Sequence, residues 1–153
     1  MKPKIVDAEA MKRHAAEFVS GLVPHKAHAT VVALSGELGA GKTTFAQAVA
    51  EAFGVEEVVT SPTFVLEKIY ALPVQEGLKG QKFTRLVHID AYRLRGVHEL
   101  EHLGWRELLQ DPGNLIVLEW PERVAEAVPK DVIRITLHGS GDSRTITYGT
   151  EKN

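Results

Sequence analysis

TVVALSGELGAGKT, at residues 30–43, is the stretch of the chain that decides its fold. Residues 30–35 are mostly apolar or β-branched without alternation, which is typical of a strand buried on both faces of a parallel sheet. The segment from about Lys42 to Phe53 has apolar residues at helical spacing, and Gly54 is a candidate C-cap. The order strand, glycine-rich loop, helix indicates an α/β domain.

The segments on either side of this unit continue the alternation of helices and strands. An amphipathic helix is predicted over residues 7–22 with Asp7 as its N-cap, and another over 97–109 with an interruption at Gly104. Strands are predicted over residues 64–72, 83–89, 115–118, 132–138 and 144–148, with an exposed hairpin loop at 73–80. The chain is therefore predicted to form one three-layer α/β domain over residues 1–153, with a mainly parallel central sheet and antiparallel additions.

Residues 36–43 fit the phosphate-binding pattern G-x-x-x-x-G-K-[ST], the P-loop, at every defined position. The glycines let backbone N–H groups point at a β-phosphate, and the following helix adds its positive N-terminal end. Lys42 supplies a charge for the β- and γ-phosphates, and the Thr43 hydroxyl is a ligand for Mg²⁺. The sequence thus predicts a P-loop NTPase fold that takes a nucleoside triphosphate and Mg²⁺. The expected nucleotide contacts are Leu38, Gly39, Ala40, Gly41, Lys42, Thr43 and Thr44.

A P-loop needs a second group near its metal, usually a carboxylate at the end of a neighbouring strand. Asp90 and Glu119 each follow an apolar strand directly, where ligands bind in open α/β sheets. One of them could hold Mg²⁺, directly or through water, while the other orients the attacking water. Spacing does not rank the two, and the alternative for each is a helix N-cap or an ion pair with a nearby arginine.

A third group of polar residues, at positions 60–63, follows the P-loop helix. Hydroxyls at that point could sense a γ-phosphate, as switch threonines do in GTPases. A capped turn held by Pro62 explains the same residues equally well.

Residues 98–102 match H-E-x-x-H, the zinc-protease pattern in which two histidines bind the metal and a glutamate activates water. Gly104 interrupts the segment soon after His102, and a chain of this size has little room for a peptide cleft beside a nucleotide site. We therefore expect a solvated, charged helix face and no zinc. His14, His25, His28 and His138 show no ligand spacing and are expected at or near the surface.

The composition limits the partners of this chain. A net charge of −2 gives no global positive field, so any RNA contact is expected to be local or made by partners. The chain has no cysteine, which excludes disulfides and fits a reducing compartment. Its apolar runs are far shorter than the ~20 residues that span a bilayer. A cytoplasmic protein without a membrane partner is expected.

The P-loop and three further blocks together resemble the TsaE family, formerly YjeE, over nearly the whole chain. The blocks are GELGAGKTTF at 36–45, SPTF at 61–64, HIDAYRL at 88–94 and LEWP at 118–121. The acidic stretch of that family, ending in leucine-glycine, falls on residues 99–104. The resemblance thus favours the solvated helix over the zinc-protease pattern.

The resemblance implies a partner-dependent ATPase. Members of the family support synthesis of threonylcarbamoyladenosine next to the anticodon of tRNAs that read codons beginning with A. They bind the TsaB–TsaD complex, in which TsaD carries the transferase chemistry, and hydrolyse ATP to permit repeated turnover, so tRNA is reached indirectly. Carried over by position, Lys42 and Thr43 hold phosphate and magnesium, Glu119 matches the magnesium-linked glutamate, and Asp90 matches the aspartate needed for hydrolysis.

The resemblance also points to the adenine contacts and leaves two other functions to weigh. Adenine would lie near Val6 or Asp7 and near the turn at residues 142–144, up to Arg144. A small-molecule kinase would use the same P-loop, but the chain has no long arginine-bearing lid beyond the short YRLR run at 92–95. A nucleotide-gated binding module with negligible turnover is the third possibility.

Overall fold

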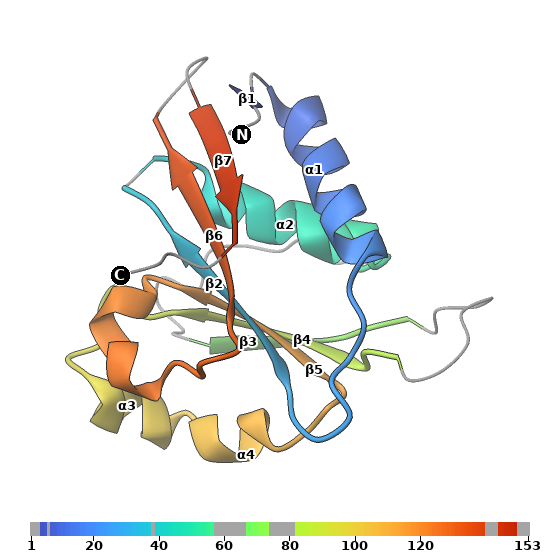
Figure 1. The fold of residues 1–153 in the computed structure, drawn as a ribbon. Helices are drawn as coiled ribbons and strands as arrows, with labels where there is room; N and C mark the ends of the chain where they lie inside the picture. Colours follow the sequence, from blue (N-terminus) through green and yellow to red (C-terminus); the bar gives the residue numbers. More distant parts are fainter. Residues whose placement is uncertain are drawn as a thin grey trace.

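The fold is a seven-stranded sheet between two layers of helices (Figure 1). The computed structural model describes residues 4–5, 7–37, 39–56, 67–73, 82–139 and 144–149. Within these ranges the elements are β1 Lys4–Ile5, α1 Ala8–Ser20, β2 Thr30–Ser35, α2 Lys42–Ala52, β3 Glu67–Ala71, β4 Arg85–Asp90, α3 Val97–His102, α4 Trp105–Leu109, β5 Asn114–Glu119, the 3₁₀-helix η1 Pro121–Ala127, β6 Ile133–His138 and β7 Arg144–Tyr148.

The strand order is β1-β7-β6-β2-β5-β4-β3. The four central strands β6, β2, β5 and β4 are parallel to one another. Antiparallel pairs extend this centre at both edges, with β3 on β4 at one edge and β7 on β6 at the other, followed by β1 on β7. The predicted mainly parallel sheet with antiparallel additions is confirmed. Among the described helices, none has the length and apolar character needed to cross a bilayer.

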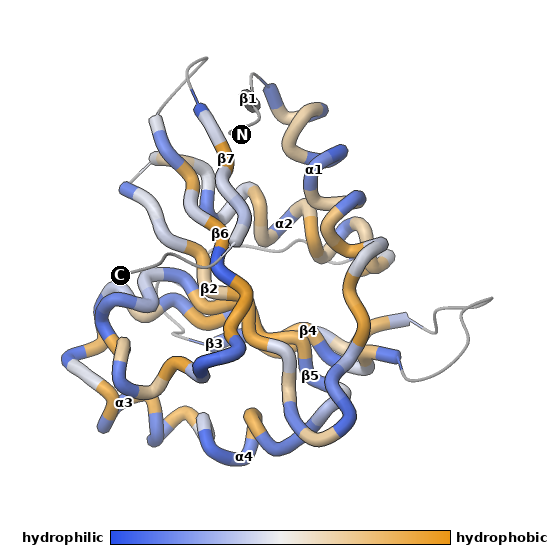
Figure 2. Tube along the Cα trace, viewed as in Figure 1, coloured by the Kyte–Doolittle hydropathy of each residue, from blue (hydrophilic) through white to orange (hydrophobic). Residues whose placement is uncertain are grey.

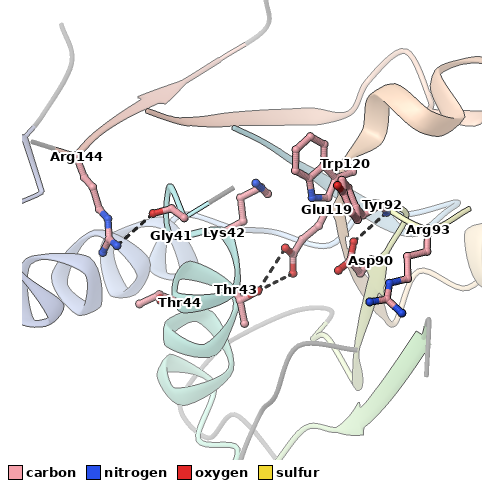
Figure 3. A pocket seen from close by; sticks show the side chains of 11 residues that line it. Gly41, Lys42, Thr43, Thr44, Asp90, Tyr92, Arg93, Glu119, Trp120 and Arg144 are labelled. Carbon is pink, nitrogen blue, oxygen red and sulfur yellow. Dashed lines mark hydrogen bonds between the residues drawn. The ribbon is translucent and has the colours of Figure 1, made fainter. Parts of the chain in front are cut away.

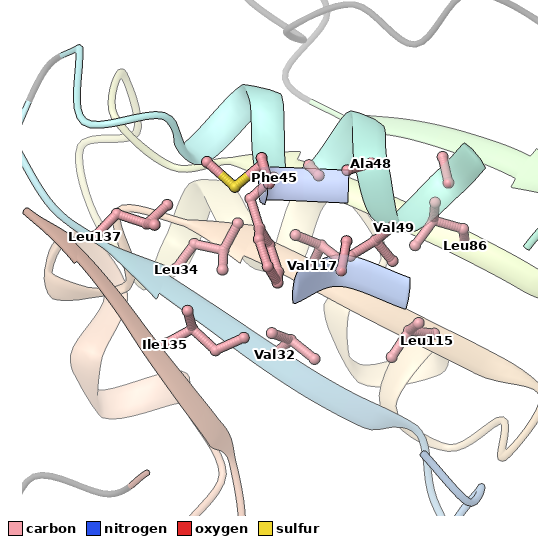
Figure 4. Packing of buried hydrophobic residues seen from close by; sticks show 14 of the residues in the cluster. Val32, Leu34, Phe45, Ala48, Val49, Leu86, Leu115, Val117, Ile135 and Leu137 are labelled. Carbon is pink, nitrogen blue, oxygen red and sulfur yellow. The ribbon is translucent and has the colours of Figure 1, made fainter. Parts of the chain in front are cut away.

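Apolar residues of the central strands face both layers, as the continuous apolar run of β2 predicts. Val32 and Leu34 of β2 pack with Phe45 and Val49 of α2 on the face that also carries α1 (Figure 4). Val31 and Ala33, which alternate with them on β2, face the other layer, built from α3, α4 and η1. This alternation follows from the two-residue period of a strand. The middle of the sheet is accordingly the most apolar part of the trace in Figure 2.

Several local predictions hold at the ends of the helices. The Asp7 side chain caps α1 by accepting a hydrogen bond from the Ala10 N–H at 2.8 Å. Gly54, with a φ of +86°, follows the end of α2, where its N–H donates to Glu51 O and the next N–H to Ala50 O. This is the Schellman pattern of helix termination. Gly104, with a φ of +84°, separates α3 from α4 as expected.

Two elements were not predicted, and two predicted segments fall partly outside the described residues. The missed elements are β1, whose two residues are too short to show a period, and η1, whose 3₁₀ geometry lacks the 3.6-residue repeat. Of the strand predicted over 64–72, the structure describes the part from Glu67 onward, in which β3 ends at Ala71. Of the loop predicted at 73–80, only Pro73 is described.

Candidate functional site

The P-loop, Glu119 and Asp90 meet because they lie at the carboxyl ends of three adjacent parallel strands, β2, β5 and β4. β5 lies between β2 and β4, and in the sheet register Glu119 is paired with Leu34 on one side and Asp90 on the other. Parallel strands end at the same edge of a sheet, and ligands of open α/β folds bind there. A cavity of about 400 Å³ opens at this edge (Figure 3). Its lining residues are Gly39, Gly41, Lys42, Thr43, Thr44, Asp90, Tyr92, Arg93, Glu119, Trp120 and Arg144.

The loop itself needs glycine at two positions. Gly36 has a φ of +148°, and a Cβ there would lie 2.3 Å from the carbonyl oxygen of Leu137 on β6. Gly41, at the start of α2, has a φ of +107°, and its Cβ would lie 3.1 Å from the Met11 side chain. Side chains at such φ values are strained in addition to these contacts. Glycine therefore lets the loop pass close to β6 and α1.

Lys42 folds back over the loop, with only 5% of its surface exposed. Its Nζ donates to Gly36 O at 2.5 Å and to Glu37 O at 3.0 Å, and it lies 4.2 Å from the centre of the Trp120 ring. Burial lowers the pKa of Lys42, and the nearby Glu119 carboxyl opposes that shift. The structure thus places a largely buried cation beside the cavity.

Thr43 and Glu119 face each other across this cavity (Figure 3). The Thr43 hydroxyl lies 3.4 Å from both carboxyl oxygens of Glu119, which is 2% exposed. Hydroxyl and carboxyl oxygens are the ligands that Mg²⁺ prefers, so the pair fits a magnesium ion. The geometry settles which carboxylate stands beside the P-loop threonine: it is Glu119.

His88 is a residue of the site that the sequence analysis missed. Its Nε2 lies 2.5 Å from Oε2 of Glu119, and both side chains are buried. His88 stands two residues before Asp90 on β4, and side chains two apart on a strand point to the same face. A histidine inside the apolar run LVHI, on the face of a candidate ligand, was the signal that could have revealed it.

Asp90 lies on the far side of Glu119 from Thr43. Its Oδ1 accepts a hydrogen bond from the Tyr92 N–H at 2.9 Å, so it also holds the turn after β4. Burial raises the pKa of Asp90, and the neighbouring Glu119 adds to the rise. Asp90 is therefore a cavity carboxylate that also holds a turn, and the helix N-cap considered from the sequence is not formed, because α3 begins only at Val97.

Comparison with known proteins shows the family of this chain. The family model "Threonylcarbamoyl adenosine biosynthesis protein TsaE" matches residues 5–146. The chain belongs to the TsaE family. A protein of Streptomyces coelicolor named tRNA threonylcarbamoyladenosine biosynthesis protein TsaE is 42% identical over 70% of this chain and 67% of its own length. A protein of Treponema pallidum with the same name is 37% identical, covering 77% of this chain and 80% of its own.

A solved structure gives the same result for the fold. The crystal structure of Bacillus subtilis YdiB superposes with a TM-score of 0.71 and 28% identity, covering 97% of this chain and 83% of that chain. The resemblance to TsaE stated from the four sequence blocks is confirmed.

An aromatic pair, Tyr92 and Trp120, lines the cavity. Trp120 has a φ of +59°, rare for a residue other than glycine, and its ring lies 4.9 Å from that of Tyr92. The guanidinium of Arg123 lies 5.3 Å from the Tyr92 ring. Backbone strain of this kind persists where the surroundings fix it. Here the strained residue carries the ring that covers Lys42.

The other residues predicted to contact the nucleotide do not all line the cavity. Ala40 is fully buried, and Leu38 and the polar group at 60–63 lie outside the described residues. Of the residues considered for adenine, Arg144 lines the cavity and donates to Gly39 O at 3.2 Å. Asp7 caps α1, as predicted, and is not among the residues that line the cavity, while its contact with adenine stays a prediction. Val6 and residues 142–143 are not described.

The H-E-x-x-H segment lies on α3, which is only six residues long. The rings of His98 and His102 are 4.5 Å apart and exposed. The Glu99 carboxyl accepts a hydrogen bond from the Arg95 N–H at 2.7 Å. Within the described ranges, no third metal-ligating side chain joins this pair in a cluster.

Proposed function

We propose that this chain is a Mg²⁺-dependent ATPase that supports threonylcarbamoyladenosine synthesis on tRNA together with TsaB and TsaD. Membership of the TsaE family, and the names of its relatives, support the tRNA-modification role. One observation carries the activity: the Thr43 hydroxyl and the Glu119 carboxyl face each other beside Lys42 in a single cavity. That arrangement combines a phosphate cradle with two oxygen ligands for a metal.

In this proposal the chain holds the nucleotide through the P-loop. The loop N–H groups and Lys42 receive the phosphates, and Thr43 and Glu119 hold Mg²⁺. Bound Mg²⁺ supplies charge neutralisation at the phosphate oxygens. Because burial disfavours the charged form of Lys42, contact with an anionic phosphate stabilises the lysine as well as the ligand.

Asp90 and His88, two further polar groups, have different roles in the proposed site. Asp90 lines the cavity next to Glu119, and the environment that raises its pKa makes it a better proton acceptor than an ordinary aspartate. We assign it the orientation of the attacking water. His88 holds the Glu119 carboxyl in place from below the cavity floor. With a net charge of −2, the chain is expected to meet tRNA through its partners.

The test is ATP hydrolysis with Mg²⁺, measured for the chain alone and with TsaB and TsaD present. We expect the partners to raise the rate, and Lys42→Ala to abolish the stimulated hydrolysis. Lys12→Ala is the matched control, because the ion pairs that Lys12 makes with described residues, Glu9 on α1 and Glu51 on α2, are exposed and contribute little.

Two outcomes would contradict the proposal. Hydrolysis that is indifferent to both partners, with phosphate transfer to a small acceptor, would indicate a small-molecule kinase. ATP binding without hydrolysis, even with both partners present, would indicate a nucleotide-gated binding module.

A further inference from the structure

A second cluster of metal-ligating side chains lies at the end of the sheet opposite the P-loop. His25 and His28 belong to the connection between α1 and β2, and Asp131 lies just before β6. β2 and β6 are parallel neighbours, so the segments that lead into them are adjacent. One ligand atom from each of the three side chains lies within 4.8 Å of the other two.

His28 is oriented as metal-bound histidines are. Its Nδ1 lies 2.8 Å from Ala29 O, and since a carbonyl only accepts, Nδ1 carries the proton. A backbone carbonyl on one ring nitrogen commonly fixes the ring of a metal ligand. In the neutral ring, Nε2 is then left with its lone pair.

That lone pair faces a carboxylate. Nε2 of His28 lies 3.1 Å from Oδ2 of Asp131. Two acceptors at this separation require a cation between them, either a proton or a metal ion. Bonds of about 2.0–2.2 Å from one Zn²⁺ to a nitrogen and an oxygen are compatible with that spacing.

His25 brings a second imidazole to the same place. Its ring is stacked on that of His28, with centroids 3.6 Å apart and planes at 9°. The nitrogen lone pairs lie in the ring planes, so the His25 ring turns out of this stack when both imidazoles bind one ion. Nδ1 of His25 accepts from the Ala27 N–H at 3.0 Å. Coordination through either nitrogen breaks that bond, because it needs the Nδ1 lone pair or moves the ring proton onto Nδ1.

We propose that His25, His28 and Asp131 bind a transition-metal ion of the Zn²⁺ class. Two imidazoles and a carboxylate suit Zn²⁺, whereas Mg²⁺ prefers oxygen ligands, so this site is chemically distinct from the one at Thr43 and Glu119. A cavity of about 520 Å³ beside the cluster leaves room for water in a fourth position. The ion ties the α1–β2 connection to the turn that leads into β6.

The sequence predicts no zinc, because Gly104 interrupts the H-E-x-x-H segment and the other histidines show no ligand spacing. In the sequence, His25 and His28 stand close together but account for only two of the three metal ligands. The third, Asp131, is brought to them by the parallel pairing of β2 and β6.

The test is a calorimetric titration of ZnCl₂ into the whole chain, without an affinity tag and without nucleotide. We expect one site, lost in His28→Gln and weakened at least about tenfold in Asp131→Asn, since removing a ligand exceeds the outer-shell changes that cost about 10–100-fold. MgCl₂ should give no binding at this site. The Ala27 amide should shift in the NMR spectrum on addition of ZnCl₂, because its hydrogen bond to His25 is broken.

The control is the double variant His98→Gln, His102→Gln, which removes the other histidine pair and should bind Zn²⁺ as the unaltered chain does. Absence of Zn²⁺ binding would overturn the proposal, as would binding that survives both His28→Gln and Asp131→Asn. Loss of binding in the double variant would assign the ion to α3 instead. His28 and Asp131 are partly exposed, so these variants are expected to fold.

Discussion

Contacts at the candidate site converge on the carboxyl group of Glu119. Thr43 approaches it from the P-loop side and His88 from the sheet, while Asp90 stands next to it on the neighbouring strand. A carboxyl group buried this deeply is stable only when its oxygens have partners. The functional geometry of the cavity therefore depends on residues below its floor as well as on those that line it.

The contact between His88 and Glu119 gives the first prediction. His88→Ala leaves Oε2 of the buried Glu119 with only the longer contact to the Thr43 hydroxyl among its described partners, so the free energy of unfolding should fall by about 1–3 kcal/mol. Hydrolysis by the folded variant should fall at least about tenfold, because a misplaced ligand weakens the metal site. Urea unfolding and steady-state hydrolysis measure the two effects. His88→Gln keeps a donor and should recover part of both; unchanged hydrolysis in His88→Ala would show that Glu119 needs no support from it.

Asp90 gives a prediction in which stability and activity move in opposite directions. A carboxyl whose pKa is raised in the folded state binds its proton more tightly there than in the unfolded chain. Stability therefore falls as pH rises from the ordinary value of 3.8 through the raised folded value, and the loss persists at neutral pH. Asp90→Asn has no such loss and keeps an oxygen for the Tyr92 N–H.

The variant should accordingly be more stable than the unaltered chain at pH 7, and the difference should shrink toward pH 3. Its hydrolysis should fall by about 10²–10⁴-fold, the usual contribution of a positioned proton acceptor. Denaturant unfolding at several pH values checks the first effect and partner-stimulated hydrolysis the second. A variant that is less stable at pH 7 than at pH 3, relative to the unaltered chain, would contradict the sign.

At the scale of elements, the P-loop is fixed by its contact with the end of β6. Gly36→Ala would place a methyl group 2.3 Å from Leu137 O at a φ of +148°, and the obstacle is backbone rather than a movable side chain. Unfolding free energy should fall by at least about 2 kcal/mol, which for a domain of this size lowers the melting temperature by about 4–8 °C. Nucleotide affinity should fall with it.

Gly96→Ala is the matched control, because an added Cβ there meets no atom within 4 Å. Its melting temperature should stay close to that of the unaltered chain. Similar losses in both variants would mean that the loss in Gly36→Ala reflects general intolerance of the chain to alanine and not the approach of the P-loop to β6.

The elements also show how far the sequence determines this structure. β2 and β7 begin and end where periodicity and composition predict, and the Asp7 cap follows from local chemistry alone. The P-loop and both carboxylates were likewise found, because each follows an apolar strand. Spacing did not rank Asp90 and Glu119, which only the resemblance to TsaE told apart, because the rank depends on which strand lies next to β2 and a long-range pairing leaves no mark in a local pattern.

At the scale of the whole molecule, the two helix layers share their strands. Along β2, Val32 and Leu34 belong to the apolar cluster under α1 and α2, and Val31 and Ala33 to the cluster under α3, α4 and η1. Because β2 contributes to both clusters, its unfolding disrupts both of them. We therefore propose that residues 1–153 form a single domain that unfolds in one cooperative transition.

The two tryptophans allow this proposal to be tested across the sheet. Both pack in the layer of α3, α4 and η1, whereas Val49 is buried in the opposite layer. Val49→Ala removes buried methyl groups and should reduce the unfolding free energy by about 1–3 kcal/mol. If the layers unfold together, tryptophan fluorescence and far-UV circular dichroism should report the same lowered urea midpoint. A fluorescence midpoint that stays in place while the dichroism midpoint falls would divide the chain into two units and overturn the single-domain proposal.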